Sequence, residues 1–427
     1  MLSGSARNAP AIATDLARLT DPASGLLESA ADAMGGVLHE PALIQVDHRP
    51  GRGTTVAYRA RVEWPDGMST ETFGARLSSG LPRDETDPGV LRLSDGHHEV
   101  QVWRFPADPM LPALASVCDR AARADLLRAV GLDPAGSRVR VVGYRPCRRA
   151  VVEITTPLTR RYVKVLRPGR AAGVHRRLAL TRAAGVPTPR SLGWSDDGAV
   201  VLEALPGVGL RNVLQRVGRR ACSPDALTHV LDLLPAELCD LPRRPPWSEA
   251  AAHYACVIAS IVPELGDRAA AVAAAVTSGL DYGAGAEPVH GDFYEAQLLT
   301  GGGKITGLLD VDRAGPGHRV DDLACLLAHL SVLVVMAPSE STGVQAALGE
   351  WAAWFDRTVD RRQLRVGAAG TALSLAPGPY RAQDPGWRDA VHHRVALAEQ
   401  WLAAARTAAL PDFESALINA SGPSHLA

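Results

Sequence analysis

Residues 289–312 read VHGDFYEAQLLTGGGKITGLLDVD, and no other stretch of the chain is as informative. Two short apolar runs, Gln297–Leu299 and Ile305–Leu309, flank the glycine-rich segment Thr300–Lys304. A glycine-rich connection between two short apolar runs is typical of a β-hairpin. The stretch therefore predicts a hairpin set into a region that is otherwise rich in Ala and Leu and reads as mainly helical.

Oxygen-bearing side chains stand at the ends of the two predicted strands. Asp292 opens the loop before the first strand, Gln297 follows five residues later, and Asp310 ends the second strand. A hairpin brings these three side chains to one edge, where a carboxylate and an amide oxygen suit a hard cation such as Mg²⁺. Asp292 would then be free to accept a proton from a hydroxyl group, as phosphoryl transfer requires. Asp312 is a secondary candidate for contact with the metal or the substrate.

The order of these motifs resembles the aminoglycoside phosphotransferase family and related small-molecule kinases with a protein-kinase-like fold. The chain has His290-Gly291-Asp292, then Gln297, then Leu309-Asp310-Val311-Asp312, then Asp322-Leu323-Ala324. The resemblance implies that Asp292 is the catalytic base, that Gln297 and Asp310 hold Mg²⁺, and that His290 is a hydrogen-bonding scaffold residue. The family usually has Asn where this chain has Gln297. From the residues alone, Asp321-Asp322 are expected to cap the following helix.

Lysine is rare in this chain, which makes one lysine informative. Of 45 basic residues only Lys164 and Lys304 are lysines. Lys164 lies in the strand-like run Arg161–Leu166, and the resemblance implies that it holds the α- and β-phosphates of ATP. A compact ammonium group suits a crowded phosphate pocket better than a planar guanidinium.

The resemblance also implies a nucleotide hinge at Glu203-Ala204-Leu205, where backbone groups would meet the adenine edge. Tyr144–Arg149 (YRPCRR) takes the place of the phosphate-covering loop but lacks a glycine-rich pattern. The family pairs its lysine with a helix glutamate, whereas Arg170–Arg182 contains no acid and has His175 in roughly that position.

The N-terminal half predicts a duplicated three-stranded antiparallel unit. After a helix expected over residues 8–35, strands are expected within 42–64 and 70–77, and again within 138–155 and 161–166. Aligning the third strands places Ala75 opposite Lys164. The expected fold is therefore α+β and protein-kinase-like, with a β-rich N-lobe, a mainly helical C-lobe and a cap that partly duplicates the N-lobe sheet. The expected divisions are a cap at 1–135, an N-lobe and hinge at 136–206 and a C-lobe at 207–427. A cap of this kind resembles maltokinase-like and amino-sugar-kinase-like members.

Composition excludes several classes of protein. The 427 residues carry a formal net charge of −1, which argues against a general nucleic-acid binder. The apolar run 323–338 is short and follows two aspartates, so no membrane span is expected. The six cysteines lie 17 or more residues apart, without a C-x-x-C spacing, and the N-terminus lacks an export signal. These features favour a cytoplasmic protein without nucleic-acid or membrane partners.

The leading hypothesis is an ATP-dependent kinase that phosphorylates a hydroxyl of a sugar, amino sugar or aminoglycoside, with Tyr294 and Glu295 as residues that could face the acceptor. A nucleotide-binding pseudokinase or regulatory module is the main alternative, because the helix acid is missing and Gln297 replaces the usual Asn. A third interpretation, a metal-dependent phosphohydrolase using His290, Asp292, Asp310, Asp312 and His318, gives no role to Lys164.

Overall fold

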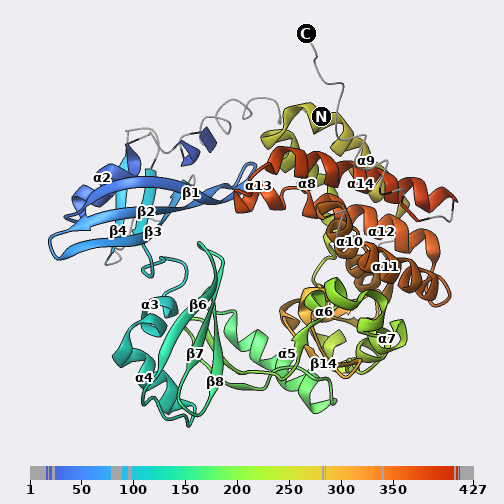
Figure 1. The fold of residues 1–427 in the computed structure, drawn as a ribbon, viewed down its shortest axis with the longest axis horizontal. Helices are drawn as coiled ribbons and strands as arrows, with labels where there is room; N and C mark the ends of the chain where they lie inside the picture. The colour runs from blue at the N-terminus through green and yellow to red at the C-terminus, as the bar shows by residue number, and fades with distance from the viewer. Residues whose placement is uncertain are drawn as a thin grey trace. The chain divides into compact units, whose positions relative to one another are not determined.

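The chain folds into two compact units, shown together in Figure 1. The first comprises residues 1–175, 191–203 and 380–385, and the second comprises 176–190, 204–379 and 386–427. The computed structural model describes residues 16, 17, 19–21, 25–77, 89–94, 99–280, 283, 285–337, 341–407, 410, 411 and 413. The chain passes between the units at Glu203 and Ala204. The predicted division at residue 135 lies inside the first unit and stays a prediction.

The first unit contains two antiparallel sheets of five strands. The strand orders are β1-β2-β3-β5-β4 and β6-β7-β8-β10-β9, so each sheet is built by the same path of the chain. This correspondence confirms the predicted duplication and extends it from three strands to five. The strands are β1 (Val37–Arg49), β2 (Gly53–Trp64), β3 (Gly67–Leu77), β4 (Val90–Ser94), β5 (Glu99–Arg104), β6 (Arg138–Arg145), β7 (Arg149–Thr155), β8 (Arg160–Leu166), β9 (Ser191–Trp194) and β10 (Ala199–Glu203).

Each sheet has an apolar cluster on one face, to which alternate residues of its strands contribute. In the first sheet Phe73, Ala75 and Leu77 of β3 enter an apolar cluster, and in the second Val163 and Val165 of β8 do so. Helices supply the remaining secondary structure of this unit: α2 (Leu26–Ala33), α3 (Ala113–Cys118), α4 (Arg120–Ala129) and the start of α5 (Ala171–Ala183).

The register of the two sheets corrects the alignment of Ala75 with Lys164. In the second sheet Lys164 pairs with Val151. The residue of the first sheet that corresponds to Val151 is Thr55, and Thr55 pairs with Arg76. Ala75 lies on the buried core face, so it corresponds to a neighbour of Lys164 and not to Lys164 itself. A shift of one residue in a strand moves a side chain to the other face of the sheet, which is why a gap-free alignment misplaced the position.

The N-terminal helix expected over residues 8–35 is interrupted: Leu16, Ala17, Leu19 and Thr20 are helical, but Asp21 and Gly25 are not, and a separate helix, α2, follows. α2 begins at Leu26, directly after Gly25, which has a left-handed conformation with φ 70°. Residues 8–15 lie outside the described part of the chain.

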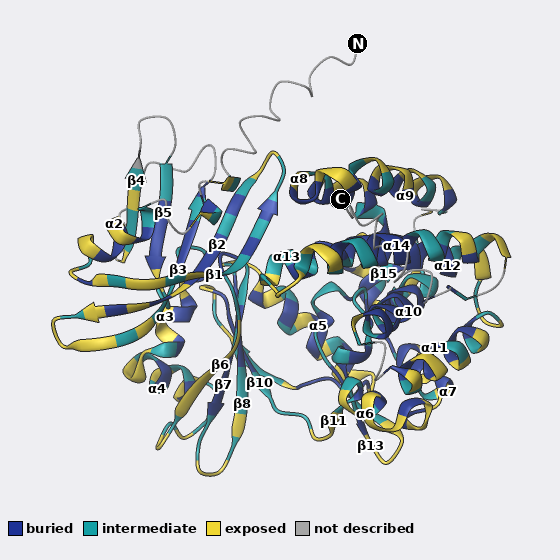
Figure 2. Ribbon diagram, turned by 45° about the horizontal axis from the view of Figure 1, so that its top comes forward, coloured by how far each residue is buried: buried dark blue, intermediate teal, exposed yellow. Residues whose placement is uncertain are grey.

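The second unit is mainly helical, as the sequence predicts. Short strands interrupt the helices: β13 and β14 form the predicted hairpin, β11 pairs with β13, and β12 pairs with β15. α10 and α12 are the central helices, with most of their residues buried (Figure 2). Among the described residues no helix has the length and apolar character needed to cross a membrane. The elements are β11 (Val208–Gly209), α6 (Leu210–Val217), α7 (Pro224–Asp232), α8 (Ala251–Ile261), α9 (Gly266–Gly279), β12 (Glu287–Val289), β13 (Leu298–Gly301), β14 (Lys304–Leu308), β15 (Gly315–Gly317), α10 (Arg319–Met336), α11 (Thr342–Phe355), α12 (Arg361–Leu375) and α14 (Trp387–Thr407). α13 (Gly378–Ala382) starts in this unit, and its residues from Tyr380 onward belong to the first unit.

Replacing Gly198 by alanine is expected to destabilise the second sheet. Gly198 precedes β10 with φ 112°, and an added Cβ would overlap the backbone carbonyl oxygen of Leu166. We expect Gly198→Ala to lower the free energy of unfolding by more than about 3 kcal/mol, measured by urea denaturation. Gly185→Ala is the matched control, because Gly185 also has a positive φ of 84° but no atom within 4 Å of the added Cβ. The control should cost only about 1–2 kcal/mol, and equal losses in the two variants would contradict the steric argument.

Candidate active site

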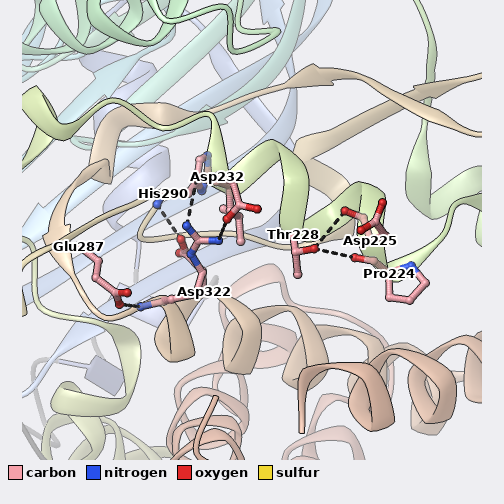
Figure 3. A network of polar contacts seen from close by, with 9 residues as sticks. Pro224, Asp225, Thr228, Asp232, Glu287, His290 and Asp322 are labelled. Atoms are coloured by element: carbon pink, nitrogen blue, oxygen red, sulfur yellow. Dashed lines mark hydrogen bonds and ion pairs between the residues drawn. The ribbon is translucent and has the colours of Figure 1, made fainter. Parts of the chain in front are cut away.

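A buried carboxylate fixes the start of the predicted catalytic loop. The two oxygens of Asp322 accept hydrogen bonds from the backbone N–H group of His290, at 2.7 Å (Figure 3), and from that of Gly291, at 2.8 Å. Asp322 is fully buried, in the first turn of α10. The expectation that Asp322 caps this helix is therefore wrong: His318 occupies the N-cap position, and Asp322 binds the loop instead.

The first turn of α10 is also tied to its other neighbours. The backbone N–H of Arg319 donates to Glu287 of β12 at 2.9 Å, and its guanidinium donates to Asp232 of α7 at 2.7 Å (Figure 3). The carboxylate of Asp322 thus extends from a helix end that contacts two further elements.

His290 and Gly291 shape the loop in different ways. Nε2 of His290 lies 2.8 Å from the carbonyl oxygen of Leu309, which can only accept, so Nε2 carries the hydrogen. Nδ1 is then the acceptor for the backbone N–H of Asp292 at 3.3 Å. Gly291 has φ 77°, and a Cβ there would lie 2.8 Å from the backbone oxygen of Arg313. These contacts make His290 a positioning residue and explain why glycine separates it from Asp292.

Asp292 interacts with an indole and with a guanidinium stacked on that indole, both of which sequence reasoning missed. Trp247 donates from Nε1 to Oδ1 of Asp292 at 2.8 Å. Arg313 stacks on the Trp247 ring with its guanidinium carbon 4.2 Å from the ring centroid, and its Nε donates to Gly291 O at 2.9 Å. Burial raises the pKa of the Asp292 carboxyl, and the charge of Asp310 raises it further, while Trp247 and Arg313 oppose both effects. The adjacent motif Arg243–Trp247 (RRPPW) offered no signal beyond an unusual proline pair.

The two predicted metal ligands are brought together by the hairpin. The backbone N–H of Leu309 donates to Gln297 O at 2.8 Å, which places Asp310 next to Gln297. The side-chain amide of Gln297 donates from Nε2 to the hydroxyl of Tyr294 at 3.2 Å. Asp310 has a left-handed backbone, with φ 58° and ψ 50°, a conformation that is costly for a residue with a Cβ and that concentrates at functional sites.

Tyr294 and Glu295, which were expected to face an acceptor, are engaged within the protein. The ring of Tyr294 stacks on His329, with centroids 3.9 Å apart. Glu295 is fully buried, and its Oε1 accepts from Arg211 of α6 at 2.7 Å. Burial lowers the pKa of His329 to about 3, so its imidazole is neutral near neutral pH.

Asp312 has a basic neighbour. Burial lowers the pKa of Arg177, and the charge of Asp312 opposes that shift, so the two groups interact. Nε of Arg177 also donates to the backbone oxygen of Ala314 at 2.7 Å. Asp312 is therefore close to Asp310 in the sequence, but it interacts with the guanidinium of Arg177.

Lys164 lies in the other unit, in the middle of β8. It is only 7% exposed, and it pairs across the sheet with Val151 and Val200. The helix residue in the position of the missing acid, His175, places Nδ1 2.8 Å from Ser191 Oγ of β9. Glu203, at the predicted hinge, ends β10 opposite Arg161. The remaining hinge residues, Ala204 and Leu205, belong to the second unit.

The loop between β6 and β7 lacks a glycine-rich pattern and is held in place by the carboxylate of Asp108. Asp108 accepts from the backbone N–H of Cys147 at 2.7 Å and from the hydroxyl of Tyr144 at 2.8 Å. Arg167 donates to the carbonyl oxygen of Cys147 at 2.6 Å, and Cys147 has φ 57°. The loop is therefore held by side chains from outside it, which its own sequence could not show.

Asp321, beside the anchoring Asp322, provides a test of buried charge. Burial, followed by the charge of Asp322, raises the pKa of Asp321 to about 7. Because the folded state binds this proton more tightly than the unfolded state, the stability contribution of Asp321 falls as pH rises from about 4 to about 7.

We expect Asp321→Asn to stabilise the protein at about pH 8 by at most about 4 kcal/mol, with the gain shrinking as pH falls toward about 4. Urea denaturation at both ends of this range measures the effect. Asp225→Asn serves as the control, because Asp225 is an exposed carboxylate in the first turn of α7. A gain that does not depend on pH would contradict the assignment.

The part of the chain that contains the candidate site matches a known protein family. The phosphotransferase enzyme family (APH) matches residues 148–365, about half of the chain, including the candidate site. No curated protein matches the sequence significantly.

Solved structures with a similar fold show low sequence identity. An aminoglycoside phosphotransferase APH(3'')-Id from Streptomyces rimosus is 23% identical over 61% of this chain and 98% of its own, with a TM-score of 0.41. A choline/ethanolamine kinase family protein from Mesorhizobium loti is 16% identical over 70% and 97%, with a TM-score of 0.45. A thermostable mutant of APH(4)-Ia, in complex with ADP and hygromycin B, is 13% identical over 65% and 97%, with a TM-score of 0.47. These likenesses are too distant to carry an argument about substrate. The family match covers half of the chain and shows that the protein belongs to the phosphotransferase enzyme family.

Proposed function

We propose that this phosphotransferase uses ATP and Mg²⁺ to phosphorylate a hydroxyl of a small polar acceptor, namely a sugar, an amino sugar or an aminoglycoside. One observation carries the proposal: Asp292, Gln297 and Asp310 are brought together on a loop whose backbone is fixed by a fully buried carboxylate. Phosphoryl transfer depends mainly on such positioning and on electrostatic stabilisation.

Asp292 is the proposed general base. Its Oδ1 already accepts from Trp247, so Oδ2 is the oxygen that would accept the proton of the acceptor hydroxyl. The hydrogen bond from Trp247 and the charge of Arg313 favour the ionised carboxylate that a base requires. The same bond fixes the rotation of the carboxylate, so the acceptor hydroxyl would approach a base of defined orientation.

The donor set around Asp310 fits Mg²⁺. Gln297 uses its amide nitrogen toward Tyr294, which leaves the amide oxygen as a ligand beside the Asp310 carboxylate. Asp292 and Asp310 repel one another, and a bound cation would relieve that repulsion. Gln297 and Asp310 would hold the ion, with Asp312 as the secondary candidate. When bound, Mg²⁺ supplies neutralisation of the phosphate charge.

The nucleotide contacts would come from Lys164 in the first unit and from the hinge, where the chain passes from the first unit to the second. Lys164 on β8 would hold the α- and β-phosphates, and backbone groups at Glu203, Ala204 and Leu205 would meet adenine. The rigid loop at Tyr144–Arg149 would offer backbone amides and arginines in place of glycines. Use of ATP, together with six free cysteines, favours a cytoplasmic location.

A nucleotide-binding pseudokinase is the second candidate, favoured by the pairing of His175 with Ser191 in place of a helix acid. The two candidates are separated by a screen of ATP consumption against sugars, amino sugars and aminoglycosides. The proposed kinase consumes ATP in a manner that depends on one acceptor class. A pseudokinase binds Mg·ATP without any such dependence.

Asp292→Asn is expected to lower the transfer rate by about 10²–10⁴-fold, because it removes the base but can still accept the bond from Trp247. Nucleotide affinity, measured by isothermal titration with Mg·ATP, should stay within about twofold of the parent. Full activity in this variant with the acceptor found in the screen would rule Asp292 out as the base.

Lys164→Arg tests the nucleotide side. A planar guanidinium should not replace the ammonium group in a buried position on β8, so we expect kcat/KM for ATP to fall by about 10–100-fold. Lys304→Arg is the matched control, because Lys304 is the only other lysine and is exposed in the hairpin turn. Equal activity of both variants would show that Lys164 has no special role.

A further inference from the structure

Three side chains of different chemistry converge at the candidate base. Cys325 and His329 are four residues apart and therefore lie on one face of α10. One ligand atom from each, together with a carboxylate oxygen of Asp292, lie within 4.8 Å of one another. Within the described part of the chain, no other group of His, Cys, Asp and Glu residues meets this criterion.

The donor set differs from the one proposed for Mg²⁺. A thiolate, an imidazole and a carboxylate are the ligands that Zn²⁺ and similar thiophilic cations take, whereas Mg²⁺ takes oxygen. Ligand atoms around a four-coordinate zinc lie about 3.4–3.6 Å apart. The observed cluster would therefore have to contract by roughly 1 Å on binding. Three protein ligands leave a fourth position open for water.

Supporting contacts hold two of the three ligands in place. The His329 ring is stacked on Tyr294 with an interplanar angle of 16°, which fixes the plane of the imidazole. Trp247 holds Oδ1 of Asp292, so the carboxylate cannot turn freely. Contacts of this kind commonly orient metal ligands in proteins.

The charge around Cys325 favours a cation. Cys325 interacts with the carboxylates of Asp292, Asp322 and Glu295, and Arg313 is the basic group that opposes them. Burial, followed by this excess of negative charge, raises the pKa of the Cys325 thiol and keeps it protonated in the absence of metal. A divalent cation would displace that proton to solvent, form the metal–sulfur bond and offset the repulsion among the carboxylates. His329 and Asp292 are partly exposed, which gives the ion a route of entry.

We infer that Asp292, Cys325 and His329 form a binding site for a thiophilic divalent cation such as Zn²⁺, and that its occupation blocks the base. Binding of the cation does not depend on the proposed function. Inhibition does rest on the proposed function, because it requires Asp292 to be the base. A carboxylate bound to the metal can no longer accept the proton of the acceptor hydroxyl.

The binding test uses Co²⁺ and Cd²⁺ as spectroscopic probes on the full chain without nucleotide. We expect a thiolate-to-metal charge-transfer absorption that saturates at one equivalent and is competed by Zn²⁺ but not by Mg²⁺. Cys325→Ser and Cys325→Ala should each lose the band, and His329→Gln should weaken binding by at least about tenfold. Two variants at Cys325 are used, with circular dichroism as the check of folding, so that a single misfolded variant does not decide the result.

Cys256→Ser is the matched control, since Cys256 is the exposed free cysteine of the chain and the one most open to adventitious binding. It should keep the band. Absence of the band in the parent protein, or its loss in Cys256→Ser and retention in folded Cys325→Ala, would overturn the inference.

The activity test is separate. With an acceptor in hand, Zn²⁺ should inhibit the parent at the concentration that saturates the site, excess Mg²⁺ should not relieve this, and a chelator should restore the rate. The inhibition constant, taken relative to each variant's own uninhibited rate, should rise at least about tenfold in Cys325→Ala. Binding without inhibition in an active enzyme would refute the blocking of the base. Binding without transfer to any acceptor would refute the proposed function and leave the metal site standing.

Discussion

Two backbone N–H groups, of His290 and Gly291, donate to one carboxylate, that of Asp322, and the arrangement of the candidate site depends on this contact. A fully buried carboxylate is costly unless it is hydrogen-bonded, and two charge-assisted bonds at 2.7 and 2.8 Å meet that need. Its position in the first turn of α10 adds the favourable end of the helix dipole. The buried carboxylate requires these two hydrogen bonds, and the same two bonds hold the backbone of the loop. The conformation at His290 and Gly291 is therefore strongly specified.

Fixing those two residues fixes the groups that follow. Nε2 of His290 donates to the carbonyl oxygen of Leu309, at the end of the hairpin. The backbone N–H of Leu309 in turn donates to the carbonyl oxygen of Gln297. The result is a set of carboxylates close to one another, of which Asp292 and Asp310 repel directly. Such repulsion is unfavourable for folding and is typical of sites that bind cations or move protons. Trp247 and Arg313 oppose the rise in the pKa of the Asp292 carboxyl and so offset part of this repulsion, and Arg211 pairs with the nearby Glu295.

The parts of this site that could be predicted are those that are local in sequence. The hairpin, the loop before it and the oxygen-bearing residues at its ends lie within residues 289–312, so spacing alone places them together. Trp247 is 45 residues from Asp292, and Arg211 is 84 residues from Glu295. Neither has a pattern of its own, and each becomes visible only when packing brings it to the loop. Asp322 was seen but misassigned, because an acid at the start of a helix fits a cap equally well.

The duplicated sheets also show which features sequence can predict and which depend on strand pairing. Strand content and order could be predicted, but the residue matched to Lys164 depended on a register that only pairing reveals, and the correct match is Arg76. This position is therefore basic in both copies. In the first sheet Arg76 interacts with Cys147 and Arg167, the residues of the loop between β6 and β7 and its support. The cation on the third strand has thus been kept while its surroundings changed. Arg76 is half-buried, whereas Lys164 is buried on β8. A planar guanidinium suits the more open of the two positions, and a compact ammonium group suits the more enclosed one.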